Sequence, residues 1–200
     1  MTQQFLTDNG ATILISSIEY ECRSMKSIQE ASPGKSRVRL NQLWSSEQMV
    51  KRICGVDVWI MRDDQGRPTL VNSPKKVSIS HSSDRISVIA GDDRAVAIDI
   101  ERSNRSVSKI ADRFTTPSEV DLFQQVFPKN PALVIWTCKE CLFKILGSQA
   151  VMFKDDLVAM DARWENDTLC SEWSINHHSF SGKIQTKSFI FEDVIVSYID

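Results

Sequence analysis

The spacing of hydrophobic and polar residues divides the chain into helical and extended stretches. Arg37–Cys54 carries apolar residues at helical spacing, and Val107–Arg113 is predicted to be helical as well. Thr116-Pro117-Ser118-Glu119 opens a further helix, and Asn130-Pro131 is a similar start signal before a helix over Trp136–Leu146. Shorter apolar runs indicate strands. The predicted strands are Ala11–Tyr20, Val56–Met61, Lys76–Ser80, Arg85–Ala90, Ala95–Glu101, Leu157–Trp164, Thr168–Ile175, Lys183–Phe191 and Val194–Ile199.

The order of these elements predicts an α+β fold in two similar halves. The first half reads strand, helix, then strands, and the second reads strand, helices, then strands. We place the boundary near Asp92–Arg94, which gives an N-terminal half of residues 1–93 and a C-terminal half of residues 94–200. Since no Pro- or Ser-rich linker marks this boundary, we expect the halves to pack as one unit.

Composition excludes several classes of protein. With 42% hydrophobic residues the chain can form a core, and a net charge of −2 argues against nucleic acid as the main partner. No apolar run approaches the length of a membrane span, and the N-terminus lacks the pattern of a signal peptide. We therefore expect a cytoplasmic protein without a membrane partner. Because two similar halves are present in one chain, we expect a monomer.

The five cysteines are odd in number and scattered, which is typical of a reducing compartment. Cys138 and Cys141 form a Cys-x-x-Cys inside a predicted helix, and no second pair accompanies them, so we expect them to be structural. His177 and His178 lack an acid or cysteine at metal spacing and are predicted to lie in a surface turn.

Two carboxylates share one face of a predicted buried strand. Asp99 and Glu101 are two residues apart, so their side chains point to the same side. Among apolar neighbours the two acids repel each other and lose hydration, which favours a bound cation. On the predicted helix, Glu140 and Lys144 stand one turn apart. Together these residues predict a Mg²⁺-dependent phosphate site; solvated acids at a strand end and a surface salt bridge are the alternatives.

Four motifs in order make the chain resemble 4′-phosphopantetheinyl transferases of the Sfp type. The family patterns are Gly-Lys-Pro, Asn/Ser-hydrophobic-Ser-His-Ser, Gly-hydrophobic-Asp-x-Glu and Trp-x-x-Lys-Glu-(Ala/Ser)-x-x-Lys. The matching segments are Gly66–Pro68, Ser78–Ser82, Ala97–Glu101 and Trp136–Lys144. Each motif alone is a weak signal, but their order makes a strong one. The resemblance implies a pseudo-dimer of two similar α/β halves, with coenzyme A bound in the cleft between them.

The resemblance also implies an activity. The enzyme would transfer 4′-phosphopantetheine from coenzyme A to a serine of an acyl or peptidyl carrier protein, with Mg²⁺, and release adenosine 3′,5′-bisphosphate. One alternative is a non-catalytic homologue that binds coenzyme A or a carrier protein. A weaker alternative is another Mg²⁺-dependent phosphotransferase. A nucleoside-triphosphate kinase of the Walker type is disfavoured because its Gly-rich loop is absent from the sequence.

Site roles follow from the same resemblance. Asp99, Glu101 and Glu140 would bind the metal, and Glu140 would act as general base toward the carrier serine. Lys144 would pair with a phosphate or protonate the leaving oxygen. The implied contacts with the phosphates of coenzyme A are Arg67, Ser80, His81 and Lys144.

Neighbouring residues on these motifs have less definite roles. Trp136 is expected to pack behind the site, and Lys139 to reach a phosphate or the solvent. Glu119 aligns with a third acid of the family, but a capping box with Thr116 explains it equally well.

The chain departs from the family pattern at several positions. Ala97 replaces a glycine, which adds a methyl group where the cofactor could approach the backbone. Arg67 replaces a lysine, and we expect its phosphate contact to be kept. Cys141 replaces alanine or serine, a mild change.

Members of the resembled family often carry two arginines on their N-terminal helix, and this chain has only the first of them. Arg37 or Arg39 can serve as the first, but the second position falls near Glu47. Basic residues are nevertheless frequent here, which suits either a bound polyanion or a solvated helix face. They are Arg23, Lys26, Lys35, Arg37, Arg39, Lys51 and Arg52.

Overall fold

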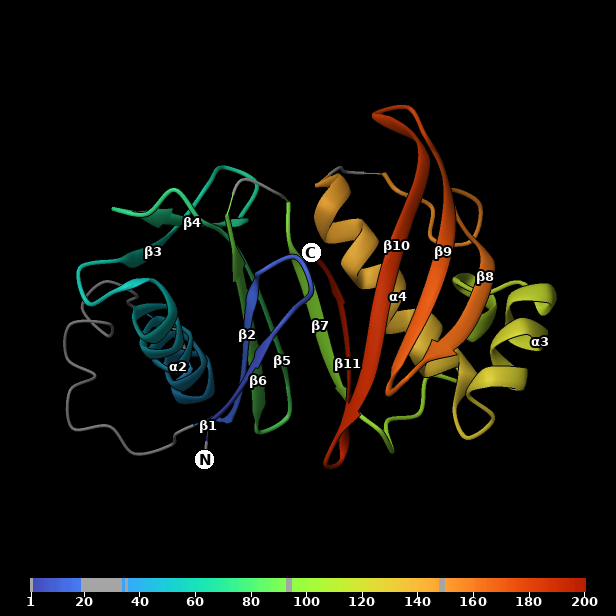
Figure 1. Ribbon diagram of the computed structural model, residues 1–200, viewed down its shortest axis with the longest axis horizontal. Helices are drawn as coiled ribbons and strands as arrows, with labels where there is room; N and C mark the ends of the chain where they lie inside the picture. The colour runs from blue at the N-terminus through green and yellow to red at the C-terminus, as the bar shows by residue number, and fades with distance from the viewer. Residues whose placement is uncertain (1, 19–33, 35, 93–94, 148–149) are drawn as a thin grey trace. The chain divides into compact units, whose positions relative to one another are not determined.

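A computed structural model describes residues 2–18, 34, 36–92, 95–147 and 150–200 (Figure 1). Contacts within the chain divide it into two compact units. Unit 1 is Met1–Val96 together with Asp200, and unit 2 is Ala97–Ile199. Both units combine helices with antiparallel sheets, in agreement with the expected α+β class. The pseudo-twofold and the cleft between the halves stay predictions.

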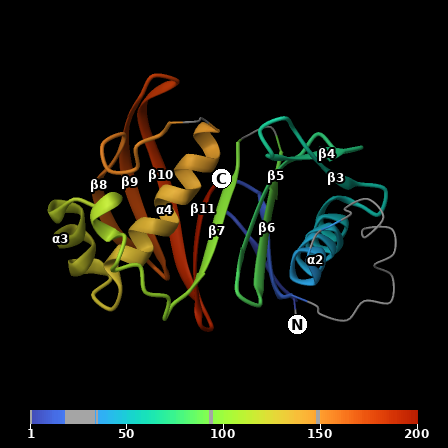
Figure 2. The same cartoon turned by 180° about the vertical axis from the view of Figure 1, so that it is seen from behind.

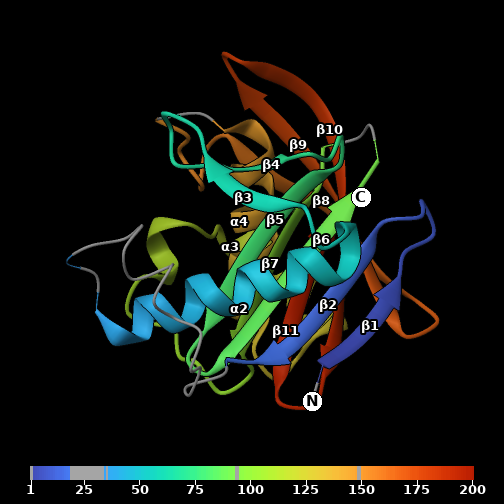
Figure 3. The same ribbon diagram turned by 90° about the vertical axis from the view of Figure 1, so that its left-hand side faces the viewer.

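Unit 1 is built around a four-stranded antiparallel sheet in the order β1-β2-β6-β5, and it also contains a short β3-β4 hairpin. Figure 3 shows α2 crossing in front of this sheet. The elements are β1 (Thr2–Leu6), β2 (Thr12–Ser17), α2 (Arg37–Cys54), β3 (Trp59–Arg62), β4 (Pro68–Val71), β5 (Lys76–Ser82) and β6 (Arg85–Gly91).

Helix α2 has local signals at both ends. The Ser36 side chain accepts the backbone N–H of Arg39 at 3.3 Å, which satisfies one of the unpaired donors of the first turn. After Cys54 the helix ends at Gly55, whose φ of 117° suits a residue without a side chain. Its apolar face packs on the sheet. The buried residues of this core are Leu14, Ile18, Met49, Val50, Val58, Val77, Ile86 and Val88.

Unit 2 is a five-stranded antiparallel sheet in the order β7-β11-β10-β9-β8, so β7 is an edge strand of the sheet. Figure 2 shows α4 crossing one face of it, with α3 near β8. The elements are β7 (Ala97–Arg102), the 3-10 turn η1 (Ala111–Arg113), α3 (Pro117–Val126), α4 (Pro131–Leu146), β8 (Leu157–Glu165), β9 (Thr168–His177), β10 (Phe180–Phe191) and β11 (Val194–Ile199).

The α4 face toward the sheet combines apolar and small polar side chains. Ile135, Cys138 and Leu142 are fully buried in the core of unit 2. Between them, the Thr137 hydroxyl lies 2.7 Å from that of Ser197 on β11. These contacts fix α4 against the strands adjoining β7, and so place its side chains near the acids of β7.

Most predicted elements are present, with a few differences. The predicted helix over Val107–Arg113 is wrong except for the single turn η1, and β1 and β4 were not predicted. Helix α4 begins at Pro131, five residues before the predicted Trp136. Some predictions lie outside the described residues: the end of the first predicted strand at Tyr20, the boundary residues 93–94 and the basic Arg23, Lys26 and Lys35.

Of the helices that the structure describes, none has the length and apolar character to span a bilayer.

Candidate active site

The two acids of β7 are almost withdrawn from water. Asp99 is 5% exposed and Glu101 is 7% exposed. They share a strand face with Ala97, whose side chain is fully buried in the core of unit 2. The methyl group that distinguishes Ala97 from glycine therefore packs inside the protein.

Each acid of β7 is paired with a cation. Lys144 Nζ on α4 lies 2.9 Å from Asp99 Oδ1 and also donates to the carbonyl of Ile98 at 2.6 Å. Glu101 forms an ion pair with Arg105, which follows β7. The Arg105 guanidinium also lies 5.9 Å from the centre of the Trp136 ring. The structure thus pairs Lys144 with Asp99, a contact that the sequence did not predict, and it adds Arg105, which the motifs did not single out.

Glu140 has the most perturbed carboxyl of this group. Burial, and then the negative charge of Asp99, raise the pKa of Glu140 to about 7, against smaller opposing effects of Lys144 and Arg105. Burial by itself lowers the pKa of Lys144, but the acids around it, Asp99 foremost, raise the pKa overall. Near neutral pH Glu140 therefore exchanges its proton readily while Lys144 stays charged, which suits a general base beside a fixed cation.

The raised pKa of Glu140 has a consequence for stability. Between the ordinary value of 4.5 and about 7, the folded protein binds more protons than the unfolded chain. The free energy of unfolding therefore falls as pH rises through that window. Glu140→Gln removes this penalty, so in EDTA we expect the variant to exceed the parent by about 1–3 kcal/mol at pH 8, and by much less at pH 4. Urea denaturation at both pH values measures this difference.

A control variant separates this effect from a general gain in stability. Glu172 lies on β9 in an exposed ion pair with Lys183 at 2.7 Å. Glu172→Gln should change stability by nearly the same amount at pH 4 and pH 8. An E140Q difference that does not depend on pH would contradict the raised pKa of Glu140.

The acids fit Mg²⁺ by their donor chemistry. Carboxylate oxygens are the ligands that this hard cation prefers, and Mg²⁺ commonly uses only one or two of them, completed by water and substrate phosphates. Within the described ranges, no three histidine, cysteine or acidic side chains gather as a complete metal-binding group. Asp99 and Glu101 on β7 are thus the suitable pair, and Glu140 as a third ligand stays a prediction.

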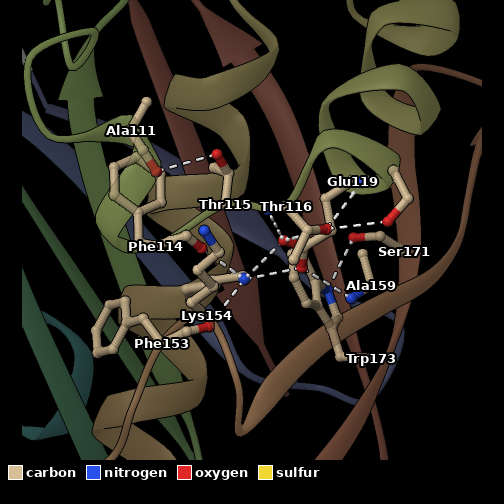
Figure 4. Close-up of polar contacts among 12 residues, drawn as sticks. Ala111, Phe114, Thr115, Thr116, Glu119, Phe153, Lys154, Ala159, Ser171 and Trp173 are labelled. Carbon is tan, nitrogen blue, oxygen red and sulfur yellow. Dashed lines mark hydrogen bonds and ion pairs between the residues drawn. The ribbon is translucent and has the colours of Figure 1, made fainter.

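Lys139 differs from expectation, because it reaches neither a phosphate nor the solvent. Its side chain is 0% exposed and lies 2.8 Å from the Glu119 carboxylate, which is 1% exposed. Glu119 also completes the predicted capping box: its Oε2 accepts the N–H of Thr116 at 2.8 Å. Figure 4 shows these contacts around Glu119. The geometry gives Glu119 the role of a helix cap and buried counter-ion, so the metal role left open for it finds no support.

The sequence held a signal for the burial of Lys139. Ile135, Cys138, Lys139 and Leu142 follow the i, i+3, i+4, i+7 spacing of one helix face, and the other three are apolar. A lysine at that position of a buried face needs an internal counter-ion.

Unit 1 contains a separate group of cations. Arg39 Nη1 on α2 lies 3.0 Å from His81 Nε2 on β5. Because arginine can only donate, Nε2 accepts and His81 is neutral in this contact. Burial, and then the charge of Arg39, lower the pKa of Arg62. Arg39 and Arg62 therefore form a basic group, with the neutral His81 ring next to Arg39, and this group suits a phosphate.

Other predicted phosphate contacts are placed differently. Ser80 is adjacent to His81 on β5, so the two side chains point to opposite faces of the strand. Arg67 is 52% exposed on its side chain, and its Nε donates to Asp63 at 2.7 Å across a turn. Glu47, where a second arginine was expected, accepts the backbone N–H of Ile60 at 3.2 Å. Arg67 and Ser80 as phosphate contacts remain predictions.

The remaining candidates of the sequence are structural. Cys138 and Cys141 are fully buried and free, and burial raises the pKa of Cys141 well above its ordinary value, so its thiol stays protonated. His177 ends β9 with its Nδ1 2.7 Å from the Ser179 hydroxyl. Its predicted surface position is wrong, because it is 8% exposed.

A family model described as the 4′-phosphopantetheinyl transferase superfamily matches residues 95–198, which is nearly all of unit 2. The match includes the acids of β7 and the whole of α4. No curated protein matches the chain.

Proposed function

Because the chain belongs to the 4′-phosphopantetheinyl transferase superfamily, we propose that it transfers 4′-phosphopantetheine from coenzyme A to a serine of an acyl or peptidyl carrier protein. The other product is adenosine 3′,5′-bisphosphate. The observation that carries this proposal is the Glu140 carboxyl, whose pKa of about 7 lies where a general base is most effective. We place the reaction in the cytoplasm and expect the protein to act as a monomer.

Glu140 takes the proton of the carrier serine, which makes its oxygen a competent nucleophile. That oxygen forms a bond to the phosphorus on the pantetheine side, and the bond from this phosphorus to the bridging oxygen breaks. The second phosphate of the pyrophosphate, with the bridging oxygen, stays on the adenosine product. Lys144 keeps its proton because its pKa is raised. It therefore acts as a fixed positive charge toward phosphate, and we do not assign it the role of general acid.

Asp99 and Glu101 would hold Mg²⁺ through their carboxylates. When bound, the ion supplies positive charge to phosphate oxygens. The ion pairs of the two acids with Lys144 and Arg105 hold these carboxylates in place.

The basic group of unit 1 is proposed to bind a phosphate of coenzyme A. Arg39→Gln removes one charge-assisted contact and should raise KM for coenzyme A about tenfold, equivalent to about 1.4 kcal/mol. Arg37, two residues earlier on α2 and exposed, provides a matched control. Equal KM increases in R37Q and R39Q would contradict a specific contact by Arg39, and initial-rate kinetics measures both.

Release of adenosine 3′,5′-bisphosphate tests the proposed reaction. We expect chromatography to detect this product only when protein, coenzyme A, Mg²⁺ and an apo-carrier protein are all present. Asp99→Asn should suppress release and also weaken Mg²⁺-dependent binding of coenzyme A in calorimetry. Product formed without a carrier would instead indicate hydrolysis of coenzyme A.

The non-catalytic alternative has lost part of its basis. Two departures from the family pattern, Ala97 and the missing second arginine, favour that alternative, but the Ala97 side chain is in the core of unit 2. Binding of coenzyme A without product, across several carrier proteins, would favour that alternative.

A further inference from the structure

We propose that Lys139 is a positioning residue for Glu140, and that its buried ion pair with Glu119 fixes the orientation of α4 that holds Glu140 beside Asp99. This inference rests on the proposed function, since it concerns the base of that reaction. It assigns a role to a charged pair that the chemistry itself does not use.

The ammonium group of Lys139 is surrounded by fixed acceptors. Nζ donates to the carbonyl of Phe114 at 2.7 Å and to that of Phe153 at 2.8 Å. Its third partner is the Glu119 carboxylate, with Oε1 at 2.8 Å and Oε2 at 3.0 Å. An ammonium has three protons, so these partners satisfy it completely.

Glu119 connects the ammonium to further segments. Its Oε1 accepts the backbone N–H of Ala159 on β8 at 3.1 Å, and its Oε2 accepts the N–H of Thr116 at 2.8 Å. Figure 4 shows Phe114, Phe153 and Ala159 arranged around this contact. One buried pair therefore ties α4 to the segment before α3, to α3 itself, to the chain before β8 and to β8.

Such a pair is not required for stability alone. Apolar residues of similar volume in place of a buried ion pair are often as stable or more stable. Part of the surroundings is already apolar, since Trp173 is fully buried with its ring centre 5.6 Å from Nζ, and Phe123 packs on Trp173 with ring centres 5.8 Å apart. Apolar contacts are non-directional, whereas charge-assisted hydrogen bonds fix distance and angle. The pair thus specifies one orientation of the helix.

The part of α4 that the ion pair fixes lies next to the proposed base, Glu140. Lys139 directly precedes Glu140, and Trp136 lies one turn before Glu140 on the same side of α4. The rings of Phe114 and Phe153, whose carbonyls hold Lys139, pack on Trp136 with centres 4.9 Å and 5.8 Å away. Lys139, Glu119 and the carbonyls of Phe114 and Phe153 together form what we call the clamp. It orders both the backbone at Glu140 and the aromatic side chains next to it.

Other contacts hold α4 on the sheet when the ion pair is removed. The hydroxyl of Thr137 remains bonded to that of Ser197 at 2.7 Å, and the Cys141 thiol donates to the Ser197 carbonyl at 3.1 Å. We therefore expect the double variant Lys139→Met/Glu119→Gln to fold. No charge is left buried in it, and the side-chain amide introduced by Glu119→Gln keeps an oxygen that can accept from the backbone.

The test compares steady-state transfer by the parent and by K139M/E119Q. We expect kcat to fall about 10–100-fold, as for a small misplacement of a reacting group, while KM for coenzyme A changes by less than about twofold. Hydrogen exchange should show faster exchange at the amides of α4 around Glu140. The control is Leu169→Ala, which removes a buried side chain from β9 and leaves the clamp intact. It should lower the denaturation midpoint without lowering kcat.

Three outcomes separate the proposals. If the parent transfers and the folded double variant has parental kcat, the positioning role is wrong. If L169A loses as much kcat as the double variant at equal loss of stability, the pair is merely structural and the inference fails. Should the parent itself show no transfer with any carrier, the proposed function fails, and unchanged hydrogen exchange at α4 in the double variant would then overturn the positioning role separately.

Discussion

Replacement of Glu140 by glutamine is expected to lower kcat for transfer by about 10²–10⁴-fold, the usual contribution of a positioned general base. Glutamine keeps the size and polarity of the side chain but cannot take the serine proton. Because burial and Asp99 disfavour the charged form of Glu140, the inactive variant should also be more stable than the parent at pH 8. Initial rates and urea denaturation on the same preparation measure both effects.

If Glu140→Gln loses activity and gains stability, Glu140 is a general base whose charged form the fold disfavours. An acid that stabilises the fold would instead lose stability on this replacement. Glu172→Gln is again the matched control, since it removes a half-buried acid on β9 that has no role in the proposed reaction and should leave kcat unchanged. An E140Q variant with near-parental kcat would exclude Glu140 as the base, even if the protein is a transferase.

Replacement of Lys139 alone by methionine is expected to lower the free energy of unfolding by about 3–5 kcal/mol. The change leaves the Glu119 carboxylate buried without its cation, and leaves the carbonyls of Phe114 and Phe153 without their donor. Denaturation of the variant, followed by circular dichroism, measures the loss.

The exposed pair of Lys183 with Glu172 provides the comparison for Lys139. The two side chains lie 2.7 Å apart, and that of Lys183 is 63% exposed, so Lys183→Met should cost less than about 1 kcal/mol. Similar losses in K139M and K183M would show that burial of the Lys139–Glu119 pair does not determine its energetic role.

Short-range patterns predicted much of the fold. The helical spacing over Arg37–Cys54 gave α2 with its observed bounds, and the capping box at Thr116 gave the start of α3. These signals depend on residues close in sequence. Strand β1 was missed because Gln3 and Gln4 interrupt its apolar pattern; it is a strand because its backbone pairs with β2. Pairing between strands depends on distant residues, which spacing does not reveal.

At the candidate site, too, local relations could be predicted from the sequence and contacts between distant residues could not. The i, i+2 relation of Asp99 and Glu101 and the i, i+4 relation of Glu140 and Lys144 are local, so the sequence could place them. The pairing of Lys144 with Asp99 joins α4 to β7 across 45 positions, and that of Lys139 with Glu119 joins two helices. Neither partner can be chosen without the tertiary packing. Lys139 was predicted to reach a phosphate or the solvent, and its place on an apolar helix face is the sequence signal that this prediction did not use.

The most direct test of the proposed transfer is the intact mass of an apo-carrier protein after incubation with this protein, coenzyme A and Mg²⁺. We expect the carrier to gain the mass of one phosphopantetheine group on a single serine, and to gain nothing when EDTA is added or when E140Q replaces the parent. An unchanged carrier mass across acyl and peptidyl carriers, with coenzyme A bound to the protein in the same mixture, would contradict the proposed transfer.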